Sequence, residues 1–251
     1  LETPESRLGW YIVLGTVLTF RVHDGYESTL ARKKYRDYWK KNVETWKRVP
    51  SPELAGVDMD IVLDPSRTGL QVKGWYDVVN HTGRPMDRFV VTVHPMWKDL
   101  RWTLNGDSLA TENRAGLHVV KLGAPLADDE QVRLGFSYTG LQPNGVSKNG
   151  GSEMEFVLPS GVVATGFSSN AIGPIIGYLP EVGVEEEKNK TDPRVYPDDY
   201  WRRVLPATLP MFDGWCDTHI RVTGPADMQH NATGVQVSEK VEKGKRITEW
   251  R

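Results

Sequence analysis

The chain has 251 residues, of which nine are tryptophan, 24 glycine and 16 proline, a composition that suits a loop-rich β protein with aromatic packing. Its formal net charge of -2, without a basic stripe interleaved with aromatic residues, excludes nucleic acid as a partner, because dense phosphate binding needs such a stripe. The single cysteine, Cys216, excludes an internal disulfide framework.

An apolar run from Trp10 to Phe20 lies near the start of the chain. It has about half of the roughly 20 residues that a membrane-spanning helix needs, and it lacks the charged flank and cleavage site of a signal peptide. We predict a buried strand here; the alternative is an interfacial segment that follows a membrane span. Because the chain begins at Leu1 and not at a methionine, and stops at Arg251 inside a strand-like run, we expect it to be a piece of a longer protein.

Residues 29–49 are predicted to form a helix. Aromatic and apolar residues recur there at steps of three to five, with Lys and Arg between them, and Pro50 and Pro52 end the pattern. We predict a solvated basic face; contact of its lysines with anionic lipid headgroups is the alternative. Residues 1–52 therefore form an N-terminal, juxtamembrane-like region, an apolar segment plus an amphipathic helix, ahead of a β domain over residues 53–251.

The β domain begins with two strands in which apolar residues occupy every second position, over residues 57–63 and 70–78. Asn105-Gly106 is the strongest short hairpin signal. The predicted fold class is mainly β, an antiparallel β-sandwich or saddle preceded by one amphipathic N-terminal helix. Further strands are predicted over residues 88–94, 100–104, 108–111, 116–122, 131–139, 153–158, 162–167, 219–223, 234–239 and 245–250.

The candidate nucleophile is Cys216, three residues before His219. An odd spacing on a strand directs the two side chains to opposite faces, which favours a structural cysteine. The sequence contains neither a His-Glu-x-x-His zinc motif nor a Gly-x-Ser-x-Gly nucleophile motif. We therefore predict no catalytic residue and no metal ligand in this chain.

Two groups of carboxylates are candidate sites. Glu153 and Glu155 share a strand face, as in a glycosidase-like carboxylate pair, but we expect both to face solvent. Asp192, Asp198 and Asp199 are candidate calcium ligands, but they lack the regular alternation of a calcium loop.

Several short motifs follow one another in a fixed order, and this order resembles the amino-terminal domain of M1-family zinc metallopeptidases. That domain is a saddle-shaped β structure that precedes the catalytic domain. The motifs are an Asp-Pro turn, a Gly-containing strand with a polar turn, a Leu-Asn-Gly hairpin, a Tyr-x-Gly strand end and a Gly-Pro crossover. They correspond to Asp64-Pro65, residues 69–83, Leu104-Asn105-Gly106, Tyr138-Thr139-Gly140 and Gly173-Pro174.

Five further segments resemble one branch, bacterial proteins in which this module is fused to an ABC-2-type transporter permease. They are Gly9-Trp10-Tyr11, residues 35–47, Pro50-Ser51-Pro52, Gly166-Phe167 and residues 174–180. The resemblance implies a position on the extracytoplasmic (periplasmic) side of a bacterial inner membrane, with the module tethered through the parent chain. Its implied partners are the preceding membrane domain and the following catalytic domain of the same polypeptide, and its implied substrate class is a peptide.

The resemblance implies a non-catalytic domain that packs against a zinc peptidase domain, absent from this chain, and walls its cleft. No cofactor is expected on this chain, and zinc is expected only in the following domain. The residues implied to line the cleft come just before the Gly-Pro crossover and are Thr165, Gly166, Phe167, Ser168, Ser169 and Asn170.

The alternative function is a ligand-binding or adaptor β-sandwich that serves a transporter and has no peptidase role. Trp75, Trp97 and Trp102 would then line a binding face for a sugar or a peptide. We expect at least two of these three tryptophans to be core residues instead.

Overall fold

The structure is a computed structural model, and it describes residues 4–23, 29–46, 49–93, 97–141, 156–158, 161–163, 172–178 and 216–251. The helices and strands are α1 (Pro4–His23), α2 (Thr29–Trp46), β1 (Glu53–Asp64), the 3₁₀ helix η1 (Pro65–Arg67), β2 (Gly69–Val79), β3 (Met86–Thr92), β4 (Trp97–Leu104), β5 (Asp107–Leu109), β6 (Glu112–Arg114), β7 (Leu117–Leu126), β8 (Gln131–Leu141), β9 (Phe156–Leu158), β10 (Gly161–Val163), β11 (Ile175–Ile176), β12 (Asp217–Pro225), β13 (Gln236–Glu242) and β14 (Lys245–Trp250).

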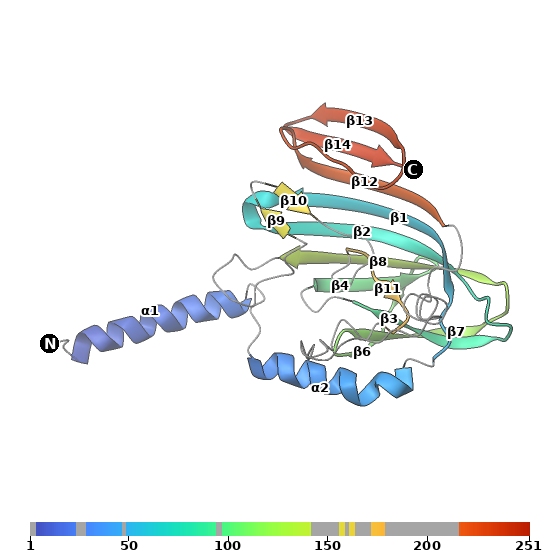
Figure 1. Cartoon of the computed structure of the whole chain (residues 1–251), viewed down its shortest axis with the longest axis horizontal. Coiled ribbons are helices and arrows are strands. Elements are labelled where there is room, and N and C mark those ends of the chain that lie inside the picture. The colour runs from blue at the N-terminus through green and yellow to red at the C-terminus, as the bar shows by residue number, and fades with distance from the viewer. Residues whose placement is uncertain are drawn as a thin grey trace, which may run out of the picture.

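The strands build one large sheet, one small sheet and a short hairpin (Figure 1). The large sheet has eight strands in the order β13-β14-β12-β1-β2-β8-β4-β5. The small sheet has four strands in the order β11-β3-β7-β6, and β9 pairs with β10. The predicted mainly β, saddle-like fold is confirmed, as is the amphipathic helix, which is α2.

The main core lies between the two sheets. Alternate residues of β1 and β2 point inward, and Met59, Val72 and Tyr76 are almost completely buried. Phe89 and Val91 of β3 face them from the small sheet. The apolar residues at every second position of these strands therefore form the core face of the large sheet, and the residues between them form its outer face.

A second core lies on the other face of the small sheet, where α2 packs. Trp39 and Trp46 of the helix contact Val90 of β3 and Leu117 of β7. The Trp39 indole N–H donates a hydrogen bond to the Ala115 carbonyl at 2.9 Å. Strand β3 is thus covered on both faces, which makes the molecule three layers: large sheet, small sheet and α2.

The prediction of a buried strand over residues 10–20 is wrong, because these residues lie in helix α1 and their side chains are exposed. A continuous apolar run has no period that separates strand from helix, so sequence pattern could not decide the case. Figure 1 shows α1 extending away from the β layers. In the described part of the chain, no helix reaches the combined length and hydropathy of a membrane-spanning helix.

One pairing departs from the antiparallel sheet that the sequence predicted. Strand β12 lies parallel to β1, with Met59 opposite Ile220 and Ile61 opposite Val222. The hairpin at Asn105-Gly106 is confirmed, because it joins β4 to β5 and both residues have a positive φ. The division of the chain at residues 52 and 53 stays a prediction.

His118 of β7 is buried beside Trp102 of β4. Its Nδ1 accepts a hydrogen bond from the Trp102 indole at 3.2 Å and lies 2.7 Å from the Thr111 hydroxyl. Burial lowers the pKa of His118 from 6.5 to about 4. The folded state therefore holds this imidazole neutral at a pH where the unfolded chain already binds a proton.

We predict that stability falls as pH drops below 6.5, because protons then bind the unfolded state more tightly. The contribution of His118 to this loss is about 2 kcal/mol between pH 8 and pH 5, measured by urea unfolding. In His118→Asn the amide oxygen keeps an acceptor for Trp102 but does not titrate, so the pH dependence should flatten. His81→Asn is the control, because Glu53 raises the pKa of that exposed histidine and the flattening should not occur.

Candidate functional site

The predicted cleft-lining residues, Thr165, Gly166, Phe167, Ser168, Ser169 and Asn170, lie outside the described residues. Directly after them, separated only by Ala171, comes the described segment Ile172 to Tyr178, which we call the crossover segment. All of its residues are buried except Ile172, which is partly buried. The contacts of this segment fix the described part of the chain that follows the candidate cleft residues.

The first half of the crossover segment is held by the large sheet. The Tyr138 hydroxyl of β8 donates a hydrogen bond to the Ile172 carbonyl at 2.5 Å. Gly173 lies directly against the Tyr76 hydroxyl of β2, and a Cβ at this position would overlap that oxygen. Only glycine allows this close approach, so the Gly-Pro motif in the sequence has a packing reason.

The second half of the segment is held by the small sheet and by α2. Ile175 and Ile176 form β11 and pair with β3. The Gly177 N–H donates to the Val90 carbonyl at 2.8 Å, and the Thr92 hydroxyl donates to the Gly177 carbonyl at 2.7 Å.

Tyr178 completes the attachment by reaching α2. Its hydroxyl donates to the Trp39 carbonyl at 2.9 Å, and its ring stacks on the Trp39 indole with the centroids 4.6 Å apart. Within seven residues the chain therefore contacts the large sheet, the small sheet and α2.

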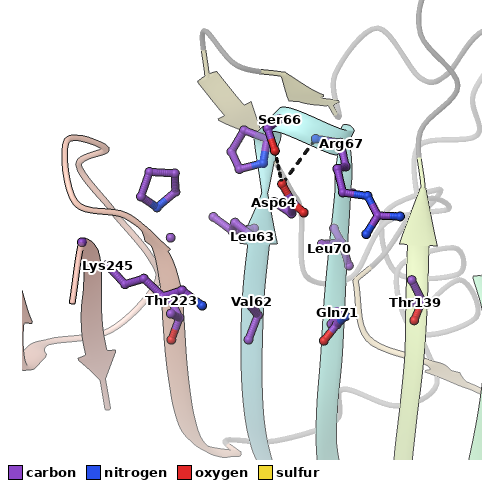
Figure 2. A pocket seen from close by; sticks show the side chains of 15 residues that line it. Val62, Leu63, Asp64, Ser66, Arg67, Leu70, Gln71, Thr139, Thr223 and Lys245 are labelled. Atoms are coloured by element: carbon purple, nitrogen blue, oxygen red, sulfur yellow. Dashed lines mark hydrogen bonds between the residues drawn. The ribbon is translucent and has the colours of Figure 1, made fainter. Parts of the chain in front are cut away.

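A hollow of about 550 Å³ lies at the end of the large sheet beside the turn between β1 and β2 (Figure 2). Its floor comes from outward-facing residues of neighbouring strands, among them Val62, Gln71, Thr139 and Thr223. Lys245 of the β13–β14 hairpin lies at its side in the same view. These residues are far apart in the sequence, and no single motif joins them, so the sequence did not predict this hollow.

The polar side chains at this turn mainly stabilise the turn itself through hydrogen bonds. Asp64 accepts hydrogen bonds from the Ser66 hydroxyl at 2.5 Å and from the Arg67 backbone N–H at 3.3 Å, as Figure 2 shows. The described residues that line the hollow include no histidine and no cysteine. It offers hydroxyls, an amide, the Asp64 carboxylate and two cations, which are groups that bind polar ligands.

A second hollow of about 420 Å³ adjoins the first and shares Val62, Gln71 and Thr139 with it. Lys73 and Arg101 add two further cations, and Asp60 adds a carboxylate that lies 3.9 Å from Arg221. The two hollows together cross the outer face of the large sheet from β4 to β12.

The structure separates Cys216 from His219. Cys216 packs against the core, and burial together with Asp217 raises the pKa of its thiol, the opposite of what a nucleophile needs. His219 lies on the outer face, with Nδ1 2.8 Å from the Asp58 carboxylate and Nε2 3.7 Å from that of Glu249. These positions support the structural reading of Cys216.

Over the residues that the structure describes, no three or more His, Cys, Asp and Glu side chains come together in a way that would hold a metal ion. The described residues therefore do not fit a zinc site. Glu153, Glu155, Asp192, Asp198 and Asp199 lie outside the described residues.

The three candidate tryptophans do not form one surface. Trp102 is buried in the main core, and Trp97 packs against that core and stacks on Tyr138. Trp75 is on the outer face, where the Arg133 guanidinium lies over its ring. The expectation that at least two of the three are core residues is confirmed.

The fold defined by these layers resembles that of the amino-terminal β domain of M1 zinc metallopeptidases. An M1 zinc metallopeptidase from Deinococcus radiodurans matches with a TM-score of 0.50 at 16% sequence identity, over 80% of this chain and 38% of that one. A mutant bound to a Tyr-Ser-Ala substrate, from the same organism, and a two-domain mutant bound to L-arginine each match with a TM-score of 0.52 at 15% identity.

The matches to the two mutant structures each cover 80% of this chain but only 39% of the mutant chain. It therefore spans well under half of the solved proteins it resembles. No protein-family model matches the sequence, and no curated protein matches it.

The contact between Gly173 and Tyr76 gives a stability test of the crossover segment. Gly173→Ala should destabilise the protein by about 2 kcal/mol, because the new Cβ overlaps the buried Tyr76 hydroxyl. Tyr76→Phe alone should be neutral or stabilising, because that hydroxyl is buried and has no hydrogen-bond partner among the described residues.

Combined in one protein, the two changes should cost less than their sum by about 1 kcal/mol or more, since the phenyl ring leaves room for the Cβ. The free energies come from urea unfolding of the four proteins of the cycle. Strict additivity would show that Gly173 does not lie against Tyr76.

Proposed function

We propose that this chain is a non-catalytic β module of a larger M1-like protein, and that it packs against a zinc peptidase domain and forms one wall of its cleft. The observation that carries the proposal is the fold likeness, which covers 80% of this chain and only 38% of a solved M1 enzyme. In this proposal the reactive centre belongs to the part of the parent protein that this chain does not match.

The crossover segment supports the role of a wall. A residue that shapes a substrate pocket has to be held in place, and rigid scaffold elements hold the loops that they carry. Residues 165–170 are followed, after one residue, by a segment fixed to both sheets and to α2. We propose that this attachment holds the candidate cleft residues against the peptidase domain.

The wider context is also part of the proposal. The parent protein is an M1-like module fused to an ABC-2-type permease, on the extracytoplasmic side of a bacterial inner membrane. The preceding membrane domain and the following catalytic domain are its partners, zinc is bound by the latter, and a peptide is the substrate class. The support is the similarity of Gly9-Trp10-Tyr11, Pro50-Ser51-Pro52 and residues 174–180 to that branch.

The test compares this chain with its full-length parent protein, using zinc analysis and hydrolysis of an aminoacyl-arylamide. The parent should bind zinc and hydrolyse the substrate, whereas this chain should do neither. In the parent, Ser168→Trp should raise the KM by roughly tenfold or more, because a bulky side chain on the wall fills part of the pocket.

Ser108→Trp is the matched control, because Ser108 is exposed on strand β5 at the edge of the large sheet. Its KM should equal that of the unchanged parent. Chelator-sensitive hydrolysis by this chain alone would contradict the proposal, and so would an equal effect of the two serine substitutions.

A further inference from the structure

Helix α1 exposes an unusual amount of apolar surface. Of the thirteen exposed large hydrophobic residues in the described part of the chain, nine are in α1, and each is between 51% and 70% exposed. At 100° per residue these nine are distributed around the whole circumference of the helix. They are Leu8, Trp10, Tyr11, Ile12, Val13, Leu14, Val17, Leu18 and Phe20.

The polar groups of α1 are arranged to suit an apolar surrounding. The Thr16 hydroxyl donates to the Ile12 carbonyl and the Thr19 hydroxyl to the Gly15 carbonyl, each at 2.8 Å. Both threonines therefore satisfy their hydrogen bonds within the helix, as polar side chains in lipid do. Residues 8–20 contain no charge, and the charged residues Glu5, Arg7 and Arg21 lie outside this stretch.

We propose that α1 inserts its uncharged stretch into a lipid bilayer. A protein partner docks on one side of a helix, whereas a helix that is apolar on all sides fits a solvent of hydrocarbon. Thirteen residues of helix measure about 20 Å, less than the roughly 30 Å of the hydrocarbon layer, so the uncharged stretch alone is too short to cross it.

Helix α2 adds a charged contact to this anchor. Its buried side carries Trp39 and Trp46, and among the described side chains of its exposed side are Lys33, Lys34, Lys41 and the acid Asp37. These side chains share one stripe of the helix and carry a net positive charge. The stripe complements anionic lipid headgroups, with which each lysine contributes to binding.

This inference extends the proposed function, which places the module beside a membrane domain, by assigning direct lipid contact to residues of this chain. The purified chain is mixed with vesicles of phosphatidylcholine alone, or of phosphatidylcholine with phosphatidylglycerol, and then floated on a density gradient. The chain should float with both and bind the anionic vesicles more tightly. Val13→Asp with Val17→Asp should weaken binding about 100-fold or more, because aspartate is expelled from hydrocarbon.

The matched control is Val237→Asp with Val241→Asp, on the edge strand β13, where the two valines are 50% and 57% exposed. It makes the same change at similar exposure and should leave flotation unchanged. On α2, Lys33→Gln with Lys34→Gln should weaken binding to anionic vesicles on the order of 25-fold and leave binding to phosphatidylcholine alone unchanged. Lys240→Gln with Lys243→Gln is the control for that pair.

Three results would overturn the proposal: no flotation with either vesicle, equal losses for the α1 and β13 pairs, or a defined oligomer in solution that the α1 pair dissolves. The last result would assign α1 to contact between copies of this chain. The parent protein that carries the α1 pair should keep its zinc and its hydrolysis, so failure of this proposal and failure of the proposed function give different results.

Discussion

The structure depends on the attachment of the crossover segment to three layers at once. Tyr138 holds its start on the large sheet, where Gly173 lies against Tyr76. Val90 and Thr92 hold its middle on the small sheet, and Trp39 holds Tyr178 on α2. Since an unpaired buried backbone group is costly, the hydrogen bonds of Gly177 and Ile172 are what allow the chain to pass through the interior.

This constraint connects the fold to the proposed role. The large sheet provides a stable outer face with two adjoining hollows, and α2 covers the far side of the small sheet. The cleft residues that the resemblance implies precede this segment in the sequence by a single residue, Ala171. A wall that is held in this way needs no catalytic residues of its own. This agrees with the general rule that the function of a scaffold is determined by the sites it carries.

The pattern of neighbouring residues in the sequence predicted those elements that depend mainly on interactions between neighbouring residues. The alternation over residues 57–63 and 70–78 marks the core face of β1 and β2, and Asn105-Gly106 forms the turn expected of it. Contacts between residues far apart in the sequence could not be predicted from local pattern. Strand β12 pairs in parallel with β1, and His219 is hydrogen-bonded to Asp58, 161 positions away in the sequence. The prediction of a strand over residues 10–20 was wrong because these side chains have no core to pack against. The hollows were not predicted because they bring together residues that no single motif connects.

Native-state hydrogen exchange on the whole chain tests the central claim most directly. If the crossover segment ties the layers together, the Gly177 amide, which donates to Val90, should exchange only through global unfolding. Its opening free energy should then equal that of the slowest amides in β1 and β2. Exchange of the Gly177 amide through a local opening several kcal/mol less costly than global unfolding would contradict the account.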